Sequence, residues 1–436
     1  MRPAKFFAKP ARRPRKRRVR LSKFIPGLRP ISPPKPRPFL FEPLEPPPLL
    51  SADPFHSAAL ATEAVDLTRR IDAINGADTL RLLDHANADA ELAAEALSNI
   101  SGVIRIIGSD FDDILRLDLD PSLLPANVLF HAGVGNDTLF GPVADTVWNI
   151  TGPNAGNIQG DKVVDFFEVE TLRGAAHNQD TFVFMSGAGL SGRVEGGDGG
   201  FDTVVLQGDY ASVTYEATGA DSGIIGLDAD LLVFDGMEPV VFDGMLQTYT
   251  HSGTSGADTI TVSPGGGAGQ IQIFGTGETV TLTSANRLII DGLGGHDSVT
   301  FTGMLNFGGA NLDIRAESIT VASSASITNA ANVSFLALAD SATNATSTLN
   351  LQAQIAVAGN MTTSGNLLIE SRVQNTLTTT SANTMTSNTS ATANIGNGAT
   401  ISAASVHLKA ATDTDLVMHR TGLVGALTLN ASTETR

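Results

Sequence analysis

Apolar and polar residues alternate along most of this chain in short segments separated by glycine-rich turns. In one recurring unit an Asp, usually followed by Thr or Ser, precedes alternating apolar residues, as in Asp180-Thr181-Phe182-Val183-Phe184. Further complete or looser copies begin at Asp78, Asp113, Asp137, Asp145, Asp202, Asp258 and Asp297. A period of two is typical of half-buried β-strands, and glycine before the Asp is typical of a tight turn. The repeat predicts an all-β, repetitive β-solenoid in place of a compact enzyme fold.

The alternation changes character along the chain. Residues 101–310 combine short strands with Gly/Asp turns, which predicts β-roll-like repeats. Residues 311–436 are rich in Ser, Thr, Ala and Asn, with apolar triplets such as Ile319–Val321 and Leu367–Ile369. That pattern is typical of a parallel β-helix whose turns carry Asn, Ser and Thr ladders. Because no closing segment follows this β-helix, we expect the polypeptide to continue beyond Arg436.

Residues 57–100 have a helical composition. Ala58–Leu67 and Ala88–Leu97 are rich in Ala, Leu and Glu, which are good helix formers. An open stack of strands exposes unpaired backbone groups, so its first coil needs a cover. We therefore predict a short helical connector or cap here.

The charge is divided sharply along the chain. Residues 1–41 hold 14 of the 28 Lys and Arg residues and no Asp or Glu, which leaves 14 basic and 45 acidic residues in the rest, a net charge of −31. Such an acidic body repels nucleic acid and attracts cations. Cysteine is absent, which excludes disulfides and thiolate sites. No apolar run is long enough for a transmembrane span.

The basic segment 1–41 is also rich in proline, so we expect a disordered or polyproline-like arm. It lacks the apolar run of an ordinary secretory signal. It also lacks the interleaved Tyr and Trp that stack on bases, so we favour an export-related segment over nucleic-acid binding.

Residues 42–56 follow this arm and contain Leu44-Glu45-Pro46-Pro47 and Leu49-Leu50-Ser51-Ala52-Asp53. This segment resembles the LEPR-XLL motif near the start of very large bacterial surface and secreted repeat proteins, although Pro47 stands where the motif has Arg. The resemblance implies an extracellular or cell-surface location and export through the N-terminal region.

Ala132-Gly133-Val134-Gly135-Asn136-Asp137-Thr138-Leu139-Phe140 resembles the RTX, or haemolysin-type, nonapeptide, with Ala132 in place of the first Gly. In that family the glycines allow a tight turn with inward carbonyls, and the Asp adds a hard oxygen ligand for calcium. Two related turns are one residue longer. The resemblance implies calcium as a cofactor, with metal-binding candidates at Gly133, Gly135, Asp137, Asp198, Asp202 and Asp297.

The spacing of the units argues against a dense row of ions. With Asp145 set aside, successive Asp residues are separated by as few as 22 residues (Asp180 to Asp202) and as many as 56 (Asp202 to Asp258), so no two of these copies are adjacent. Each Asp would meet few neighbouring ligands, and we expect at most a few weak sites, roughly millimolar. The alternative is that Asp and Gly only cap turns by bonding to the backbone.

Catalytic patterns in the sequence are weak. The eight His residues form no i, i+4 pair, and there is no Gly-x-Ser-x-Gly or P-loop. We predict no enzyme, but the N-terminal part of a large extracellular repeat protein, an adhesin or surface scaffold. Its expected partners are calcium and host or matrix glycans or surface proteins. The alternatives are a β-helical polysaccharide-active enzyme, which three or four acidic residues on one coil face would favour, and a calcium-dependent secreted toxin module.

Overall fold

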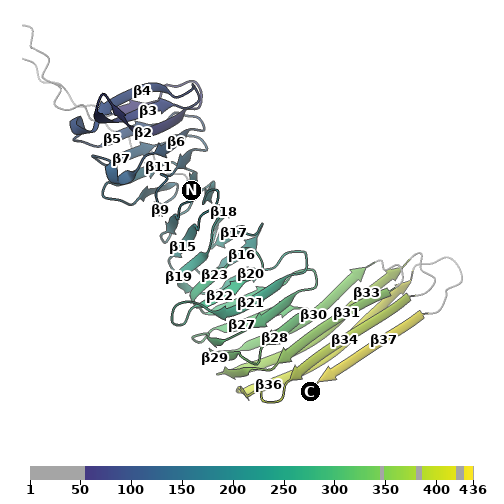
Figure 1. Cartoon of the computed structure of the whole chain (residues 1–436). Helices are drawn as coiled ribbons and strands as arrows, with labels where there is room; N and C mark the ends of the chain where they lie inside the picture. The colour runs from purple at the N-terminus through teal and green to yellow at the C-terminus, as the bar shows by residue number, and fades with distance from the viewer. Residues whose placement is uncertain (1–54, 344–347, 380–384, 419–426, 436) are drawn as a thin grey trace, which may run out of the picture. The chain divides into compact units, whose positions relative to one another are not determined.

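The fold is that of a computed structural model, which describes residues 55–343, 348–379, 385–418 and 427–435. These residues form strands and two short 3-10 helices, η1 (Leu97–Asn99) and η2 (Pro121–Leu123). The prediction of an all-β, repetitive solenoid is confirmed, because successive strands stack into long, largely parallel sheets (Figure 1). The predicted arm 1–41 and nearly all of the LEPR-XLL-like segment lie outside the described residues.

In the described part of the chain the strands form three sheets, of which sheet 1 has 17 strands. In their order across the sheet they are β1 (Phe55–Ser57), β5 (Ile104–Ile107), β7 (Val128–His131), β11 (Val164–Phe167), β10 (Ala155–Ile158), β9 (Val147–Gly152), β13 (Thr181–Phe184), β15 (Thr203–Gln207), β19 (Val240–Leu246), β23 (Val280–Ala285), β22 (Ile271–Phe274), β21 (Thr259–Pro264), β25 (Ser298–Phe301), β28 (Ser318–Val321), β31 (Thr348–Val357), β34 (Met385–Ile395) and β37 (Leu427–Thr435).

Sheet 2 has 16 strands, and sheet 3 has four. Across sheet 2 the order is β4 (Ala90–Ala96), β3 (Ala77–Asp84), β2 (Asp66–Ile74), β6 (Ile114–Asp118), β8 (Thr138–Phe140), β12 (Thr171–Arg173), β14 (Arg193–Glu195), β18 (Asp230–Asp235), β17 (Ser222–Leu227), β16 (Val213–Ala217), β20 (Tyr249–Ser252), β24 (Arg287–Asp291), β27 (Asn311–Ala316), β30 (Val333–Thr343), β33 (Asn366–Thr379) and β36 (Ser405–Met418). Sheet 3 contains β26 (Met304–Asn306), β29 (Ser326–Ala330), β32 (Asn360–Thr363) and β35 (Ile401–Ser402).

Two kinds of coil follow one another. From β5 onward the chain alternates between sheets 1 and 2, so that each coil has two strands with a turn at each end. From β25 onward each coil visits sheets 1, 3 and 2 in turn, as in β25, β26 and β27. The third strand makes the later coils those of a three-sided parallel β-helix.

The parallel stacking is interrupted by reversals, each made by a strand that is antiparallel to both of its neighbours. These strands are β3 and β17 in sheet 2, and β10 and β22 in sheet 1. Each reversal adds two strands, about 10 Å, to one sheet only. Because the reversals alternate between the two sheets along the chain, both sheets are lengthened equally.

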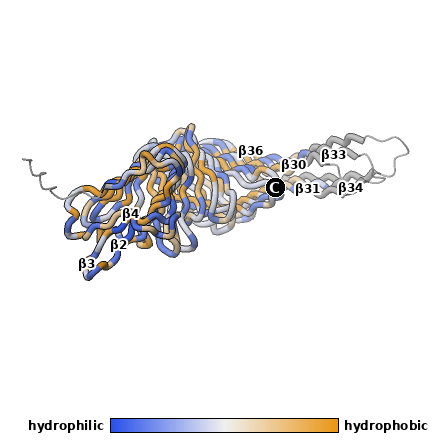
Figure 2. Tube along the Cα trace, turned by 90° about the horizontal axis from the view of Figure 1, so that it is seen from above, coloured by the Kyte–Doolittle hydropathy of each residue, from blue (hydrophilic) through white to orange (hydrophobic). Residues whose placement is uncertain are grey.

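The interior is filled by every second residue of the strands, and Figure 2 shows the resulting alternation of hydrophobic and hydrophilic residues along the chain. Aromatic rings stack between neighbouring coils. The rings of Trp148 and Phe182 are 5.2 Å apart, and those of Phe301 and Phe335 are 5.4 Å apart. Each buried ring contributes roughly 2 to 3 kcal/mol, which favours continuous stacking of the coils.

The prediction of a helical connector over residues 57–100 is wrong. This region forms β2, β3 and β4, and Ala90–Ala96 pairs antiparallel with β3 although its composition favours a helix. Its helix propensity is small beside the backbone bonds and the burial that pairing with β3 provides.

In the described part of the chain, no helix has the length and apolar character needed to cross a membrane.

Candidate functional site

Six Asp residues of the recurring unit, all except Asp78 and Asp145, lie at the coil corners and form columns that run from coil to coil. In each column, a buried carboxylate accepts a hydrogen bond from the backbone N–H at the same corner of the preceding coil. The first column contains Asp113, Asp137 and Glu170. The second contains Asp180 and Asp202, and its first hydrogen bond is donated by Thr146. The third contains Asp258, Asp297 and Glu317.

Asp137 lies in the middle of the first column and is fully buried. Its Oδ1 accepts the Asp113 N–H at 2.6 Å, and its own N–H donates to Glu170 Oε2 at 2.8 Å. Its Oδ2 has no hydrogen-bond partner among the described residues. Burial, reinforced by the charges of Glu170 and Asp113, raises the pKa of Asp137 to about 7. Asp137 therefore links three coils, through its carboxylate and its backbone N–H, at an electrostatic cost.

The second column repeats this geometry on the opposite sheet. Asp180 Oδ1 accepts both the N–H and the hydroxyl of Thr146, at 2.9 and 2.6 Å. The Asp180 N–H donates to Asp202 Oδ1 at 2.7 Å. Burial raises the pKa of Asp180, and burial together with the nearby Asp180 charge raises the pKa of Asp202 to about 6.

In the third column, the Asp258 N–H donates to Asp297 Oδ1 at 2.9 Å, and the Asp297 N–H donates to Glu317 Oε2 at 2.7 Å. Burial is the main cause of the raised pKa values of Asp297 and Glu317. Asp297 Oδ2 again has no partner. In all three columns, therefore, hydrogen bonds from backbone N–H groups stabilise a carboxylate that burial destabilises.

Glycine is required where one turn packs on the next. A Cβ at Gly196 would lie 2.0 Å from the Gly236 carbonyl oxygen and 2.6 Å from Asp202 Oδ2. At Gly133, where φ is +112°, a Cβ would lie 2.1 Å from the Ser109 oxygen, and at Gly135 it would lie 2.6 Å from the Phe111 oxygen. These predicted metal-site glycines let the turn stack closely on its predecessor.

The predicted metal-site residues do not converge. Gly133, Gly135 and Asp137 share one turn, whereas Asp202 and Asp297 belong to two other columns. Asp198 is exposed in the turn between β14 and β15, which also contains the buried Asp202. In the described part of the chain, no group of three or more His, Cys, Asp or Glu side chains is placed to hold a metal ion.

Asp198 lines a polar cavity of about 270 Å³, here called the acidic cavity. Glu195, Asp221 and Asp235 also line it, with the glycines of the adjoining turns. Strand pairing sets Glu195 beside Asp235. Arg173 also lines the cavity, and its guanidinium lies 3.4 Å from Glu195. Glu195 also lies 3.6 Å from Arg193, so it is paired with two arginines, and Asp198, Asp221 and Asp235 give the cavity its negative charge.

Sequence reasoning missed several of these acids. Glu170-Thr171-Leu172 and Glu317-Ser318-Ile319 copy the recurring unit with Glu in place of Asp, so this signal was present. Asp221 and Asp235 have no such signal. They reach the acidic cavity only because β17 reverses the chain beside β18.

The histidines do not form a site in the described part of the chain. His177 and His296 are exposed in turns, whereas His251 is fully buried and stacks on Tyr215 at 4.9 Å. Burial lowers the pKa of His251 to about 3, so its ring is neutral. Its Nδ1 lies 3.2 Å from the Tyr249 hydroxyl, which makes it part of the core.

Comparison of the chain with protein-family models, with curated proteins and with solved structures found no match.

Proposed function

We propose that this chain is a structural module of a large extracellular repeat protein, an adhesin or surface scaffold. The observation that carries the proposal is the unbroken stacking of coils, in which each coil contacts only its neighbours and presents its turns to solvent. Such a solenoid offers extended surface and length rather than one enclosed site. The acidic composition and the LEPR-XLL-like segment 42–56 support an extracellular location.

Surface labelling tests this location. Antibodies raised against the folded chain should label intact cells of the source organism, and protease added outside the cells should remove the label. Labelling that requires permeabilised cells would contradict the proposal.

We further propose that calcium binds weakly in the acidic cavity. Asp198, Asp221 and Asp235 have no ion-pair partner among the described residues, and Gly197, Gly199 and Gly236 line the cavity beside them. Carboxylate and carbonyl oxygens are the ligands that calcium prefers, and extracellular modules bind it with dissociation constants of about 0.1 to 1 mM. The buried Asp137, Asp202 and Asp297 are weaker candidates, because their Oδ1 atoms already accept backbone N–H groups.

Calorimetric titration of the full chain with calcium tests this site, with circular dichroism as a second readout. The variant Asp198→Asn/Asp221→Asn should lose the heat of binding. Asp243→Asn, which removes an exposed acid outside the cavity, should retain it. Absence of heat at millimolar calcium in the unmodified chain would end the calcium proposal and leave the scaffold proposal untouched.

A second candidate function is a polysaccharide-active enzyme, and the acidic cavity is the observation that favours it. Acids of this cavity would supply proton transfer to a bound sugar chain, and Arg173 would donate hydrogen bonds to it. Incubation with neutral and acidic polysaccharides, with and without calcium, followed by assay of reducing ends, separates the two functions. Product that is lost in Asp198→Asn would favour the enzyme.

A further inference from the structure

Sheet 3 begins in the middle of the described chain, at β26. In the coil that contains β26, residues 302–310 separate β25 of sheet 1 from β27 of sheet 2. In the coil before it, β23 of sheet 1 ends at Ala285 and β24 of sheet 2 begins at Arg287, so a single residue, Asn286, joins the two sheets. Within residues 55–343, β26 therefore has a neighbouring strand on one side only, and that strand is β29.

The other edge of β26 consists of main-chain groups of Met304 and Asn306. The Gly303 carbonyl accepts a main-chain N–H of β29 at 2.8 Å, and the Phe307 N–H donates to a carbonyl of β29 at 3.0 Å. Main-chain groups of successive strand residues point to opposite sides, so those of Met304 and Asn306 point away from β29. They form no hydrogen bond with another described residue. An edge of this kind is a template for one further strand.

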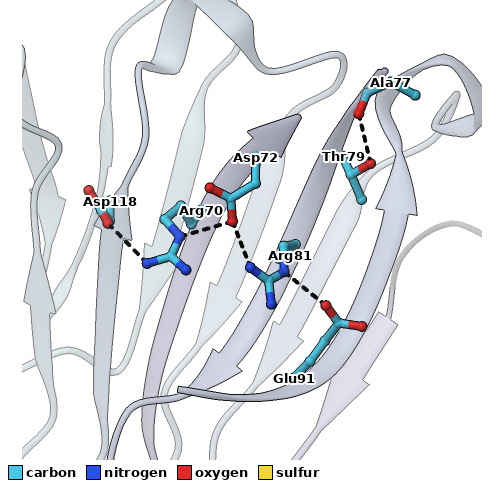
Figure 3. A network of polar contacts seen from close by, with 7 residues as sticks. All are labelled: Arg70, Asp72, Ala77, Thr79, Arg81, Glu91 and Asp118. Atoms are coloured by element: carbon cyan, nitrogen blue, oxygen red, sulfur yellow. Dashed lines mark hydrogen bonds and ion pairs between the residues drawn. The ribbon is translucent and has the colours of Figure 1, made fainter. Parts of the chain in front are cut away.

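This edge differs from the edge of sheet 2, which charges protect. Among the described residues, β4 is the edge strand of sheet 2, and it carries Glu91 and Glu95. Arg81 of β3 donates to Glu91 at 2.8 Å and to Asp72 at 2.7 Å, which places a charged network on that face (Figure 3). The sequence of β26 is Met-Leu-Asn, and Met304 is 79% exposed. Charges on an edge oppose pairing with another chain, whereas an uncharged edge with an exposed apolar side chain favours it.

A cavity of about 160 Å³ lies beside this edge. Its apolar lining comes from Ile271, Leu282 and Leu288 of the coil before and from Phe307 and Ala310, which follow β26, and all five are buried. None of the residues that line it is charged, although residues 42–436 carry a net charge of −31. An apolar cavity of roughly 150 Å³ binds a molecule as large as benzene, so this one has room for a Val, Leu or Ile side chain.

We propose that an extended segment of a partner protein adds to β26 as one further strand of sheet 3 and places an aliphatic side chain in this cavity. The main-chain groups of Met304 and Asn306 need donors and acceptors at the spacing of a strand, which a peptide backbone supplies. In β29 the residue opposite the buried Leu305 is Ile327, which is also buried. In the same register, the residue opposite Leu305 in the added strand points inward, toward the cavity. The uncharged lining offers nothing to a phosphate or an acidic sugar, so it selects an uncharged peptide segment.

Binding of a synthetic peptide to the full chain tests this proposal. The probe is acetyl-Ser-Ala-Ser-Ile-Thr-Asn-Ala-amide, which copies residues 324–330 and so contains β29, the strand that already pairs with β26. We expect saturable binding by calorimetry at millimolar peptide and slower hydrogen exchange of the Met304 and Asn306 amides. Replacing Ile by Ala in the probe should lower its affinity about tenfold or more, because less apolar surface is buried. A probe methylated on the main-chain N–H groups that face β26 should not bind.

Two variants of the chain locate the binding. Ala285→Leu fills the cavity from β23 and should lower the affinity for the probe about tenfold or more. Ala356→Leu is the matched control, because Ala356 is also a half-buried residue of sheet 1 but does not line the cavity, and it should leave binding unchanged. The comparison of the three probes does not depend on the folding of either variant.

The proposal is overturned if the probe does not bind at millimolar concentration, or if it binds without protecting Met304 and Asn306. It is also overturned if the methylated probe binds as tightly as the unmodified one, because the cavity would then take an apolar group without strand pairing. Each of these results leaves the scaffold and calcium proposals untouched, since neither depends on the edge of sheet 3.

Discussion

The early coils and the late coils use different side chains to accept backbone N–H groups at their corners. At the corners of the early coils, buried carboxylates such as Asp137 and Asp202 accept backbone N–H groups of the preceding coil. At a corner of the late coils, Asn side chains form an amide ladder that accepts N–H groups of the neighbouring coil. The Asn332 Nδ2 donates to Asn311 Oδ1 at 2.9 Å, and the Asn366 N–H donates to Asn332 Oδ1 at 2.9 Å.

The two ladders also differ in direction and in burial. The carboxylates reach back to the preceding coil, whereas Asn311 and Asn332 accept from the coil that follows. Asp137 is fully buried, and Asn332 and Asn366 are exposed. An amide has no charge to desolvate, so its bonds hold at any pH, whereas a buried carboxylate stabilises the coil to a degree that depends on its protonation.

The largest expected effect is therefore a loss of stability in the early coils as the pH rises. The folded pKa is about 7 for Asp137 and about 6 for Asp202, against about 3.9 in an unfolded chain. Between pH 4 and these values the folded state binds more protons than the unfolded state. Stability from these groups is thus fully present below about pH 4 and falls by about 1.4 kcal/mol per pH unit for each carboxyl up to its folded pKa.

Hydrogen exchange between pH 5 and pH 8, corrected for its intrinsic pH dependence, measures this loss coil by coil. Peptides from residues 104–140 and 180–207 should lose protection as the pH rises, and peptides from 326–337, which contain Asn332 and no carboxylate, should not. Equal losses in both regions would show that burial of the carboxylates is not the cause.

The next largest effect is expected for Asp137→Ala. This change leaves the buried Asp113 N–H without an acceptor, and we expect a loss of about 2 to 3 kcal/mol in the free energy of unfolding at pH 6. Asp112→Ala is the control in the same corner. Asp112 is exposed, and its bond from the Asn136 N–H can be replaced by water, so we expect a loss below about 1 kcal/mol. Urea unfolding of both variants measures this difference, provided that the dependence of the free energy of unfolding on urea concentration is the same in both.

The early coils were predictable in outline because period-two alternation is a local signal, and Trp148 and Phe182 belong to such segments. Their reversals were not predictable. Ser222–Leu227 has the same alternation as any parallel strand, and only its pairing with β16 and β18 makes it antiparallel. The choice of partner depends on contacts between coils, which a single sequence does not display.

The site was predictable only where one turn contains it. Gly133 and Asp137 were identified from their own turn, but the role of Asp137 depends on the N–H of Asp113, 24 residues earlier. The acidic cavity forms because Glu195 of β14 pairs with Asp235 of β18, and the chain reverses at β17 between these two residues. Loop lengths between such partners vary with each insertion, so no fixed spacing marks them.

A smaller effect is expected for Asp137→Asn, which separates charge from hydrogen bonding. The amide oxygen can still accept the Asp113 N–H, and the side chain no longer needs a proton to be buried. At pH 8 we expect this variant to be about 1 kcal/mol more stable than the unmodified chain, and its unfolding should lose part of the pH dependence. Urea unfolding at pH 5 and pH 8 tests this. An unchanged pH dependence would mean that another carboxylate of the columns, and not Asp137, titrates in this range.

The smallest effects should come from variants of the amide ladder. These variants decide whether burial or residue type determines how stability depends on pH. Asn332→Ala removes the bonds with Asn311 and Asn366 at an exposed corner, so we expect a loss of about 0.5 to 1 kcal/mol that is equal at pH 5 and pH 8. Asn332→Asp places a carboxylate at the same corner in contact with solvent. There, acceptance of the Asn366 N–H lowers its folded pKa, so its stabilisation should be present above about pH 4 and be lost as the pH falls. That sign is opposite to the one expected for Asp137. Melting temperatures of both variants from pH 3 to pH 8 give the answer, because a loss of stability at high pH in Asn332→Asp would mean that a corner carboxylate destabilises a coil even without burial.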